Sequence, residues 1–404
     1  MLVYNIIQVI LLSLLGLATL YIFIFSIAGL FYKEKAFVKA DQYRKIAVLI
    51  PGYKEDEVIV EVAKSALQQK YPMGHFDVVV IADSFQADTL AELRKLPVRL
   101  IEVSFDKSTK SKALHKGMAA LTSSYDIAVI LDADNIMAAD FLMKINAAFS
   151  AGAFAVQGHR TAKNQNTSWA VLDAASEEIN NHIFRKGHRV LGLSSAIIGS
   201  GMAFQYDFFR TMIADVKAVG GFDKEIELKM LKAKYRISYQ DDAMIYDEKV
   251  QKAEVFSNQR RRWLSAQLHY FRKDIIPALG HLITKGNLDY FDKAIQFIQP
   301  PRVLLIGALL LLSTIFISGN YFLNNGLNYS TAWLIITMVC ILAILLSVPR
   351  SFYTKKTGLA LISLPRGMLA MLKSLLKIKG ANKTFIHTKH TSVPDRATLE
   401  KSLR

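Results

Sequence analysis

The chain has 404 residues, of which 52% are hydrophobic, and its mean hydropathy of +0.23 lies between that of an ordinary soluble protein and that of a pure membrane bundle. Its formal net charge of +16 suits anionic lipid headgroups or nucleotide phosphates. The sequence carries no nucleic-acid-binding motif, and its single cysteine, Cys340, excludes an internal disulfide and a cysteine-based metal site.

The first apolar run extends from Leu2 to Phe31 without a charged residue, which is long enough to span a bilayer. A cleaved signal peptide would require a basic residue before the apolar run, and no Lys or Arg precedes this one. Lys33, Lys35 and Lys39 follow at once and place this end of the helix in the cytoplasm. We therefore expect an N-terminal transmembrane helix at residues 1–32.

From residue 45 onward, short β-rich runs alternate with helical segments. The strands are expected at 46–50, 77–82, 98–103 and 127–131, and the helices at 57–69, 89–96 and 112–121. This alternation predicts an α/β fold with a doubly wound parallel sheet. Such sheets bind ligands at the carboxyl ends of their strands. The polar residues at those ends are therefore candidate site residues: Tyr53, Glu55, Asp83, Asp132 and Asp134.

Two carboxylates, Asp132 and Asp134, flank one small residue directly after a buried strand. Mg²⁺ and Mn²⁺ take oxygen ligands of this kind and often bridge to substrate phosphates. Asp83 also ends a strand, where a turn or helix-capping aspartate is the alternative. Lys110 precedes an expected helix and is either a nucleotide ligand or a solvated surface lysine.

Three consecutive arginines stand between Gln259 and Trp263. Arginine suits bidentate phosphate recognition, and tryptophan offers a flat face on which a sugar can stack. The alternative is a juxtamembrane basic cluster that contacts lipid headgroups, in which Gln259 and Trp263 have no evident role.

The segment 275–299 carries apolar residues at helical spacing and is expected to form two amphipathic helices in the membrane interface. A core-facing helix pair of the soluble domain is the alternative. Two further apolar runs, 303–317 and 333–348, are joined by an uncharged linker and flanked by basic residues. The positive-inside rule then places the linker outside and both flanks in the cytoplasm. In the basic tail, the segment 364–379 mixes Leu, Met and Lys, which predicts another interfacial helix.

The ordered motifs of the chain are Pro51-Gly52-Tyr53-Lys54-Glu55, Asp83, Lys110 to Gly117, Asp132-Ala133-Asp134, Gly199-Ser200-Gly201, Asp223-Lys224-Glu225 and Gln259 to Trp263. Over residues 45–267, this set resembles the family 2 glycosyltransferases with a GT-A fold. The similar branch contains the cellulose, chitin, hyaluronan and poly-N-acetylglucosamine synthases and ceramide glucosyltransferase, whose QxxRW motif matches Gln259, Arg262 and Trp263.

The resemblance implies a role for each matching residue. Nucleotide-sugar binding falls to Tyr53, Glu55, Asp83, Lys110, Asp132, Gln259, Arg262 and Trp263. The acceptor side falls to Gly199, Ser200, Gly201 and Trp263. Asp132 and Asp134 would hold Mn²⁺ or Mg²⁺ together with the diphosphate.

The general base departs from the family pattern, in which an aspartate of a Thr-Glu-Asp motif takes the proton. Glu225 aligns with that aspartate, and Asp223 is the nearby alternative. A carboxylate there can accept the proton of an acceptor hydroxyl. One base and a metal-stabilised leaving group imply inversion, so an α-configured donor would give a β-linked product.

These observations predict a membrane-embedded enzyme that transfers sugar from a UDP-sugar to a polysaccharide or a lipid. Its domains are expected at 1–32 (membrane helix), 33–270 (cytoplasmic catalytic domain), 271–300 (interfacial helices), 301–349 (two membrane helices) and 350–404 (basic cytoplasmic tail). Export of a polymer through so few spans would need partner subunits or an oligomer. An integral protein of the plasma or inner membrane is expected. The alternatives are an inactive nucleotide-binding membrane scaffold and a metal-dependent nucleotidyltransferase.

Overall fold

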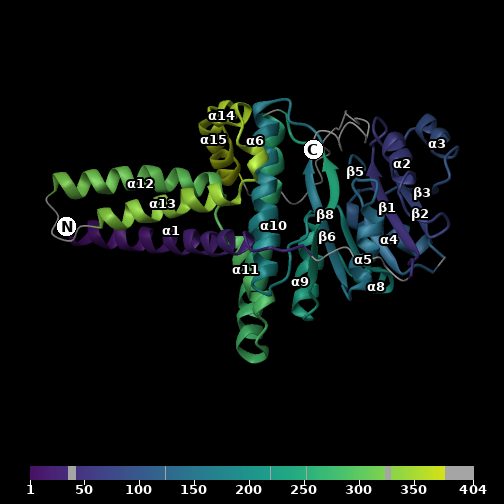
Figure 1. Cartoon of the computed structure of the whole chain (residues 1–404), viewed down its shortest axis with the longest axis horizontal. Helices are drawn as coiled ribbons and strands as arrows, with labels where there is room; N and C mark the ends of the chain where they lie inside the picture. Colours follow the sequence, from purple (N-terminus) through teal and green to yellow (C-terminus); the bar gives the residue numbers. More distant parts are fainter. Residues whose placement is uncertain (35–41, 123, 219, 252, 324–328, 378–404) are drawn as a thin grey trace.

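The computed structural model describes residues 1–34, 42–122, 124–218, 220–251, 253–323 and 329–377. A mixed α/β domain occupies one end of the molecule and a bundle of long apolar helices the other (Figure 1). The expected lysines Lys35 and Lys39, and the end of the basic tail, lie outside the described residues.

The first half of the sheet is parallel, as the sequence predicts. It contains β1 Ile46–Tyr53, β2 Phe76–Asp83, β3 Arg99–Val103 and β4 Ile127–Ile130, in the order β3-β2-β1-β4. β1 continues beyond its apolar run, so that Tyr53 pairs with Asp83 of β2. The carboxyl ends of these strands therefore form one edge.

The second half of the sheet is mixed and was not anticipated. It adds β5 Ile136–Met137, β6 Ala155–Ala162, β7 Met202–Gln205 and β8 Ile237–Asp247. β7 pairs antiparallel with both β4 and β6, whereas β6 and β8 are parallel. These strands are short or carry charged residues, so they lack the uninterrupted apolar run that identifies a buried parallel strand.

Helices cover both faces of the sheet, which makes it doubly wound. Alternate residues of β1 serve the two layers: Ile46 and Val48 face one core, whereas Ala47 and Leu49 face the other. The first layer is formed by α2 Ile59–Leu67, α3 Ala87–Leu93 and α5 Phe141–Ser150, and the second by α4 Lys110–Ala120, α8 Tyr206–Ala214 and α9 Phe222–Lys232.

Three long apolar helices lie side by side: α1 Leu2–Gly29, α12 Arg302–Phe322 and α13 Ser330–Ser347 (Figure 1). Within the described part of the chain, each is long and apolar enough to cross a membrane, as the sequence predicts. α14 Lys355–Leu361 and α15 Leu364–Leu376 meet at 50° and could form a fourth, broken span. Polar pairs fix the bundle, including Gln8 with Asn320 at 3.0 Å.

The bundle is joined to the sheet domain by α6 Ser168–Asn180, the π-helix η1 Asn181–Gly187 and α7 His188–Val190. η1 packs closely on α1 because Gly187 has no side chain. A Cβ atom at Gly187 would lie 2.2 Å from the carbonyl oxygen of Phe25, so this contact requires glycine.

The expected domain boundary at residue 270 falls inside a single helix. α10 Ala253–Lys285 carries both the arginine cluster and the first amphipathic segment, and it continues through Pro277. It runs crosswise to the three apolar helices and contacts α11 Leu288–Ile298 (Figure 1). The arginine cluster and the first amphipathic segment therefore belong to one continuous helix.

Two apolar side chains of the segment that was expected in the membrane interface face outward. Ile276 and Ile283 are 72% and 76% exposed. By contrast, Asp292 and Lys293 of α11 are buried against the rest of the protein. Ala278, Tyr290 and Phe297 on the inner side join a hydrophobic cluster with α9, so the helix pair has apolar residues on both its inner and its outer side.

Candidate active site

A cavity of about 1130 Å³ lies at the carboxyl edge of the sheet, between α9, α10 and the apolar bundle. Most of the residues expected at the site line it: Tyr53, Glu55, Asp83, Lys110, Asp132, Asp134, Gly199, Asp223, Gln259, Arg262 and Trp263. Three expected residues do not line it: Ser200, Gly201 and Glu225.

The turns after β1 and β2 shape one wall of the cavity. Lys54 and Ser84, which follow these strands, have φ angles of 54° and 59°, in a region that non-glycine residues rarely adopt. The Lys54 amide donates to the carbonyl oxygen of Asp83 at 3.1 Å, and the Ser84 hydroxyl donates to the Asp83 carboxylate at 3.0 Å. Such strained turns cluster at functional sites, and these hold Tyr53 and Asp83 at the edge.

Lys110 is the first residue of α4 and reaches the end of β4. Thr109 caps the helix by accepting a hydrogen bond from the Lys112 amide at 3.2 Å. The Lys110 ammonium donates to the Asp132 carboxylate and, at 2.8 Å, to the carbonyl oxygen of Gly199. Lys110 is therefore a fixed cation beside the acidic pair rather than a solvated lysine.

A buried network positions the two carboxylates. The Ser200 hydroxyl accepts a hydrogen bond from the Asp132 amide at 2.9 Å. In the orientation that gives both the oxygen and the nitrogen of the Asn135 side-chain amide a partner, the Ser200 hydroxyl also donates to the Asn135 oxygen at 2.8 Å. Asn135 then donates to Asp134 at 3.2 Å and to Asp247 at 3.1 Å. Ser200 was expected on the acceptor side. It instead lies behind Asp132, outside the cavity lining, and holds Asp132 in position.

The acidic pair fits a divalent cation that is shared with a substrate. Asp132 retains an accessible side chain, 31% exposed, and Asp134 lies beside it in the cavity wall. Among the described residues, no group of three or more His, Cys, Asp and Glu side chains could enclose a metal. Mg²⁺ and Mn²⁺ are commonly held by one or two carboxylates plus substrate phosphates, so two carboxylates are sufficient here.

The two candidate bases lie on different sides of α9. The helix begins at Phe222, after Gly221 with a φ of 72°, and two residues along a helix rotate the side chain by about 200°. Asp223 therefore lines the cavity, where a Cβ on Gly199 would lie 3.8 Å from its Oδ2. Glu225 instead forms an ion pair with Lys229 at 3.2 Å, outside the cavity lining.

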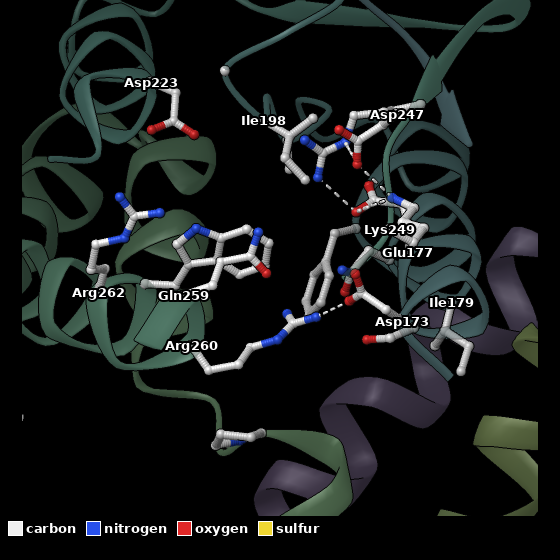
Figure 2. Close-up of a pocket in the computed structure, with 18 of the residues that line it drawn as sticks. Asp173, Glu177, Ile179, Ile198, Asp223, Asp247, Lys249, Gln259, Arg260 and Arg262 are labelled. Carbon is white, nitrogen blue, oxygen red and sulfur yellow. Dashed lines mark hydrogen bonds and ion pairs between the residues drawn. The ribbon is translucent and has the colours of Figure 1, made fainter. Parts of the chain in front are cut away.

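The arginine cluster divides between two directions. Gln259, Arg262 and Trp263 share one face of α10 and line the cavity, and burial lowers the pKa of Arg262. In Figure 2 the Arg262 guanidinium and the Asp223 carboxylate point toward one another. Arg260 also lines the cavity but points toward α6, where it binds Asp173, and it lies 4.5 Å from the centre of the Trp263 ring.

A buried charge cluster opposite Asp223 was not anticipated (Figure 2). Arg160 of β6 binds Glu177 of α6 at 2.9 Å, and Lys249 binds Asp247 at 2.8 Å. Burial alone would raise the pKa of Glu177, but Arg160, Lys249 and Arg185 hold it well below its usual range. These residues are far apart in the sequence and match none of its motifs.

Residues 44–266 match the family model described as "Glycosyltransferase like family 2", which spans more than half of the chain. The protein therefore belongs to this glycosyltransferase family, and its eight-stranded mixed sheet is typical of the GT-A fold. No curated protein sequence matches the chain.

Of the solved structures that match the chain, one with a TM-score above 0.5 supports the same fold. The mannosyltransferase PcManGT from Pyrobaculum calidifontis, in complex with GDP-Man and Mn²⁺, matches with a TM-score of 0.52 and 16% identity, over 85% of this chain and 99% of that one. S. aureus TarS matches with a TM-score of 0.40 and 15% identity, over 84% and 55% of the two chains. Glucosyl-3-phosphoglycerate synthase from Mycobacterium tuberculosis, with Mn²⁺ and UDP, matches at 0.37 and 16%, over 53% and 75%.

Proposed function

We propose that the protein is a membrane-bound, metal-dependent, inverting glycosyltransferase that transfers a sugar from a nucleoside diphosphate sugar to an acceptor hydroxyl. The observation that carries this proposal is the arrangement of one cavity. Its lining combines the strand-end acids Asp83, Asp132 and Asp134 with Lys110 and, across the opening, Asp223. An inactive scaffold would not need a carboxylate in the cavity wall opposite the donor site.

The strand edge is the proposed donor site. Tyr53 and Asp83 would hold the nucleoside, and Lys110 and Arg262 would contact the diphosphate, because both cations line the same cavity. Asp132 and Asp134 would hold Mn²⁺ or Mg²⁺, which stabilises the negative charge of a departing diphosphate when bound. Solved structures of GT-A neighbours contain Mn²⁺ with GDP-Man or UDP, which supports this choice of cation.

Asp223 is the proposed general base, in preference to Glu225. The acceptor oxygen attacks the anomeric carbon while the bond from that carbon to the diphosphate oxygen breaks. The hydroxyl proton passes to Asp223, and the nucleoside diphosphate leaves with the bonding electrons. Attack from the side opposite the leaving group inverts the anomeric carbon, so an α-configured donor gives a β-linkage. Asp223 lines the cavity and can reach a bound acceptor, whereas Glu225 lies outside the cavity lining.

The proposed location is a membrane, with the sheet domain in the cytoplasm. Three apolar helices of spanning length support membrane insertion, and Lys33 and Arg350 at the domain-side ends of α1 and α13 support this orientation. The apolar outer side of α10, at Ile276 and Ile283, would then rest on the inner membrane surface.

The test is a donor screen with the purified full-length protein in lipid nanodiscs. UDP-sugars and GDP-mannose are offered with Mn²⁺ and a membrane extract as the source of acceptor, and release of nucleoside diphosphate and transfer of label are measured. We expect one donor class to be consumed and the product to be β-linked by NMR. If no donor is consumed faster by the wild type than by a D132A/D134A variant, the proposed function is wrong.

A further inference from the structure

The cavity continues beyond the sheet edge into the apolar bundle, where its lining changes in character. The residues at that end belong to α12, α13, α14 and α15: Ile306, Ile344, Leu345, Val348, Leu361 and Met371. Leu345 and Leu361 are also 48% and 53% exposed. Since the same side chains line the cavity and reach the outer surface, the cavity opens sideways between α13 and α14.

A positive charge marks the junction between the polar and apolar parts. Arg302, the first residue of α12, donates to Asn180 Oδ1 at 2.8 Å and to the carbonyl oxygen of Ser176 at 3.0 Å. Among the described residues, no carboxylate lies within ion-pair distance of Arg302. The arginine side chain remains charged at neutral pH. Its hydrogen-bond partners Asn180 and Ser176 are neutral.

Two further polar groups at this junction lack hydrogen-bond partners among the described residues. They are the Nε of Arg260 and the Oε1 of Gln299, both buried and both on cavity-lining residues. Another nitrogen of the Arg260 guanidinium donates a hydrogen bond to the Asp173 carboxylate. Buried polar groups normally have partners, so two unsatisfied ones beside an arginine whose hydrogen-bond partners are neutral point to a polar, anionic ligand.

We propose that the acceptor is a lipid-linked sugar whose linker is a phosphate or diphosphate. The sugar hydroxyl lies at Asp223, the anionic linker binds Arg302 and Arg260, and the hydrocarbon chain leaves between α13 and α14. This inference rests on the proposed function and narrows its acceptor. A neutral polysaccharide matches neither the charge at the junction nor the apolar exit, whereas an anionic amphiphile matches both.

The experiment is photo-crosslinking of the full-length protein with a diazirine-bearing farnesyl diphosphate. Saturating nucleoside diphosphate and Mn²⁺ keep the donor site occupied, and binding of that nucleotide is measured separately. We expect crosslinks to residues of α13 and α14 that unlabelled farnesyl diphosphate competes away. Effective competition by inorganic pyrophosphate would indicate a site for a free anion, and equal competition by farnesol would indicate an apolar groove only. Either result overturns the proposal.

Two variants and their controls sharpen the test. Arg302→Gln should weaken farnesyl diphosphate binding by about tenfold to a hundredfold, as expected for a lost charge-assisted hydrogen bond. Arg350→Gln, an exposed arginine that does not line the cavity, should not. Leu361→Trp should block the lateral opening, whereas Leu359→Trp on the same helix, 66% exposed and outside the cavity, should not.

Failure of this proposal is distinguishable from failure of the proposed function. If nucleotide binds and donor is consumed, but Arg302→Gln and Leu361→Trp bind the lipid probe as the wild type does, the acceptor assignment is wrong and the glycosyltransferase assignment stands. If the nucleotide itself does not bind, both are wrong. Retained nucleotide binding by Arg302→Gln also shows that the variant is folded.

Discussion

The Lys110 ammonium donates a hydrogen bond to the Asp132 carboxylate and so ties the first turn of α4 to the end of β4. The same nitrogen lies 2.8 Å from the carbonyl oxygen of Gly199. The contact sets one positive and two negative charges side by side at the donor end of the cavity. That arrangement suits a substrate that carries both phosphate oxygens and a bound cation.

The first prediction concerns Asp132 and Asp134. Changing either to Ala should lower kcat by at least about 10²–10³, the usual cost of removing a group that stabilises transition-state charge, without unfolding the protein. A chelator should abolish wild-type transfer, and Mn²⁺ or Mg²⁺ should restore it. The measurements are product formation and thermal unfolding of the full chain. Full turnover by metal-free enzyme would contradict the assignment.

The second prediction separates positioning from contact with substrate. Ser200→Ala leaves the Asp132 amide and Asn135 without their shared partner and should destabilise the protein by about 1–3 kcal/mol. It should also lower kcat with little change in KM for the acceptor, since Ser200 does not line the cavity. Ser195→Ala is the matched control, because Ser195 is equally buried but lies outside this network. A change in acceptor KM alone would contradict the positioning role.

The third prediction is a pH dependence of stability that comes from His159. Its ring lies 2.9 Å from Glu178 of α6 and 2.9 Å from Asp241 of β8, which in turn binds Lys186 and Tyr239. Burial alone would lower the pKa of His159, but the two carboxylates raise it from 6.5 to about 10.

A folded-state pKa above the unfolded value means that this stabilisation is complete below pH 6.5 and is lost as pH rises toward 10. The Tm of the wild type should therefore fall more between pH 6.5 and 9.5 than that of His159→Gln. His75→Gln, at an exposed histidine, should behave as the wild type. Equal slopes for all three proteins would show that His159 is not charged in the folded state.

The sequence predicts the parallel half of the fold because its physical signal is local. Continuous apolar runs identify β1, β2 and β4, and the residues that end them must meet at one edge, which is how Asp83 and Asp132 are found. The pairing of Arg160 with Glu177 has no such signal. From sequence alone, a charged residue is predicted to be solvent-exposed, because the partner that would allow it to be buried is brought near only by the tertiary structure.

The sequence also does not show which side chains of a helix face the cavity. A motif alignment places Glu225 on the position of the family base, but the choice depends on where α9 begins. The left-handed Gly221 starts the helix at Phe222, and this start decides which of two neighbouring carboxylates faces the cavity. In the same way, periodicity cannot tell that α10 passes through Pro277 without a break.

The fourth prediction tests the orientation of the membrane helices. Asn324, in the linker between the last two spans, lies outside the described residues, so Tyr321 at the end of α12 is the better probe. Tyr321→Cys, 80% exposed, should react with an impermeant thiol reagent added to intact cells, whereas Met73→Cys, 95% exposed on the sheet domain, should react only after permeabilisation. Cys340 is buried and gives little background. The reverse labelling pattern would place the sheet domain outside.

The fifth prediction decides between the two carboxylates of α9. Asp223→Asn should lower kcat by about 10²–10⁴, the usual contribution of a general base, while nucleotide binding is kept. Glu225→Gln should retain most of the activity, because Glu225 does not line the cavity and forms an i,i+4 ion pair with Lys229 instead.

Lys229→Gln is the matched control for Glu225→Gln, since it breaks the same pair from the other side and should change stability by the same small amount. A lost base should also remove the ascending limb of the pH profile of kcat in Asp223→Asn, which a merely structural defect would leave in place. If Glu225→Gln is inactive while Lys229→Gln and Asp223→Asn retain activity, the alignment with the family motif identifies the base correctly. In that case, α9 must rotate when the acceptor binds.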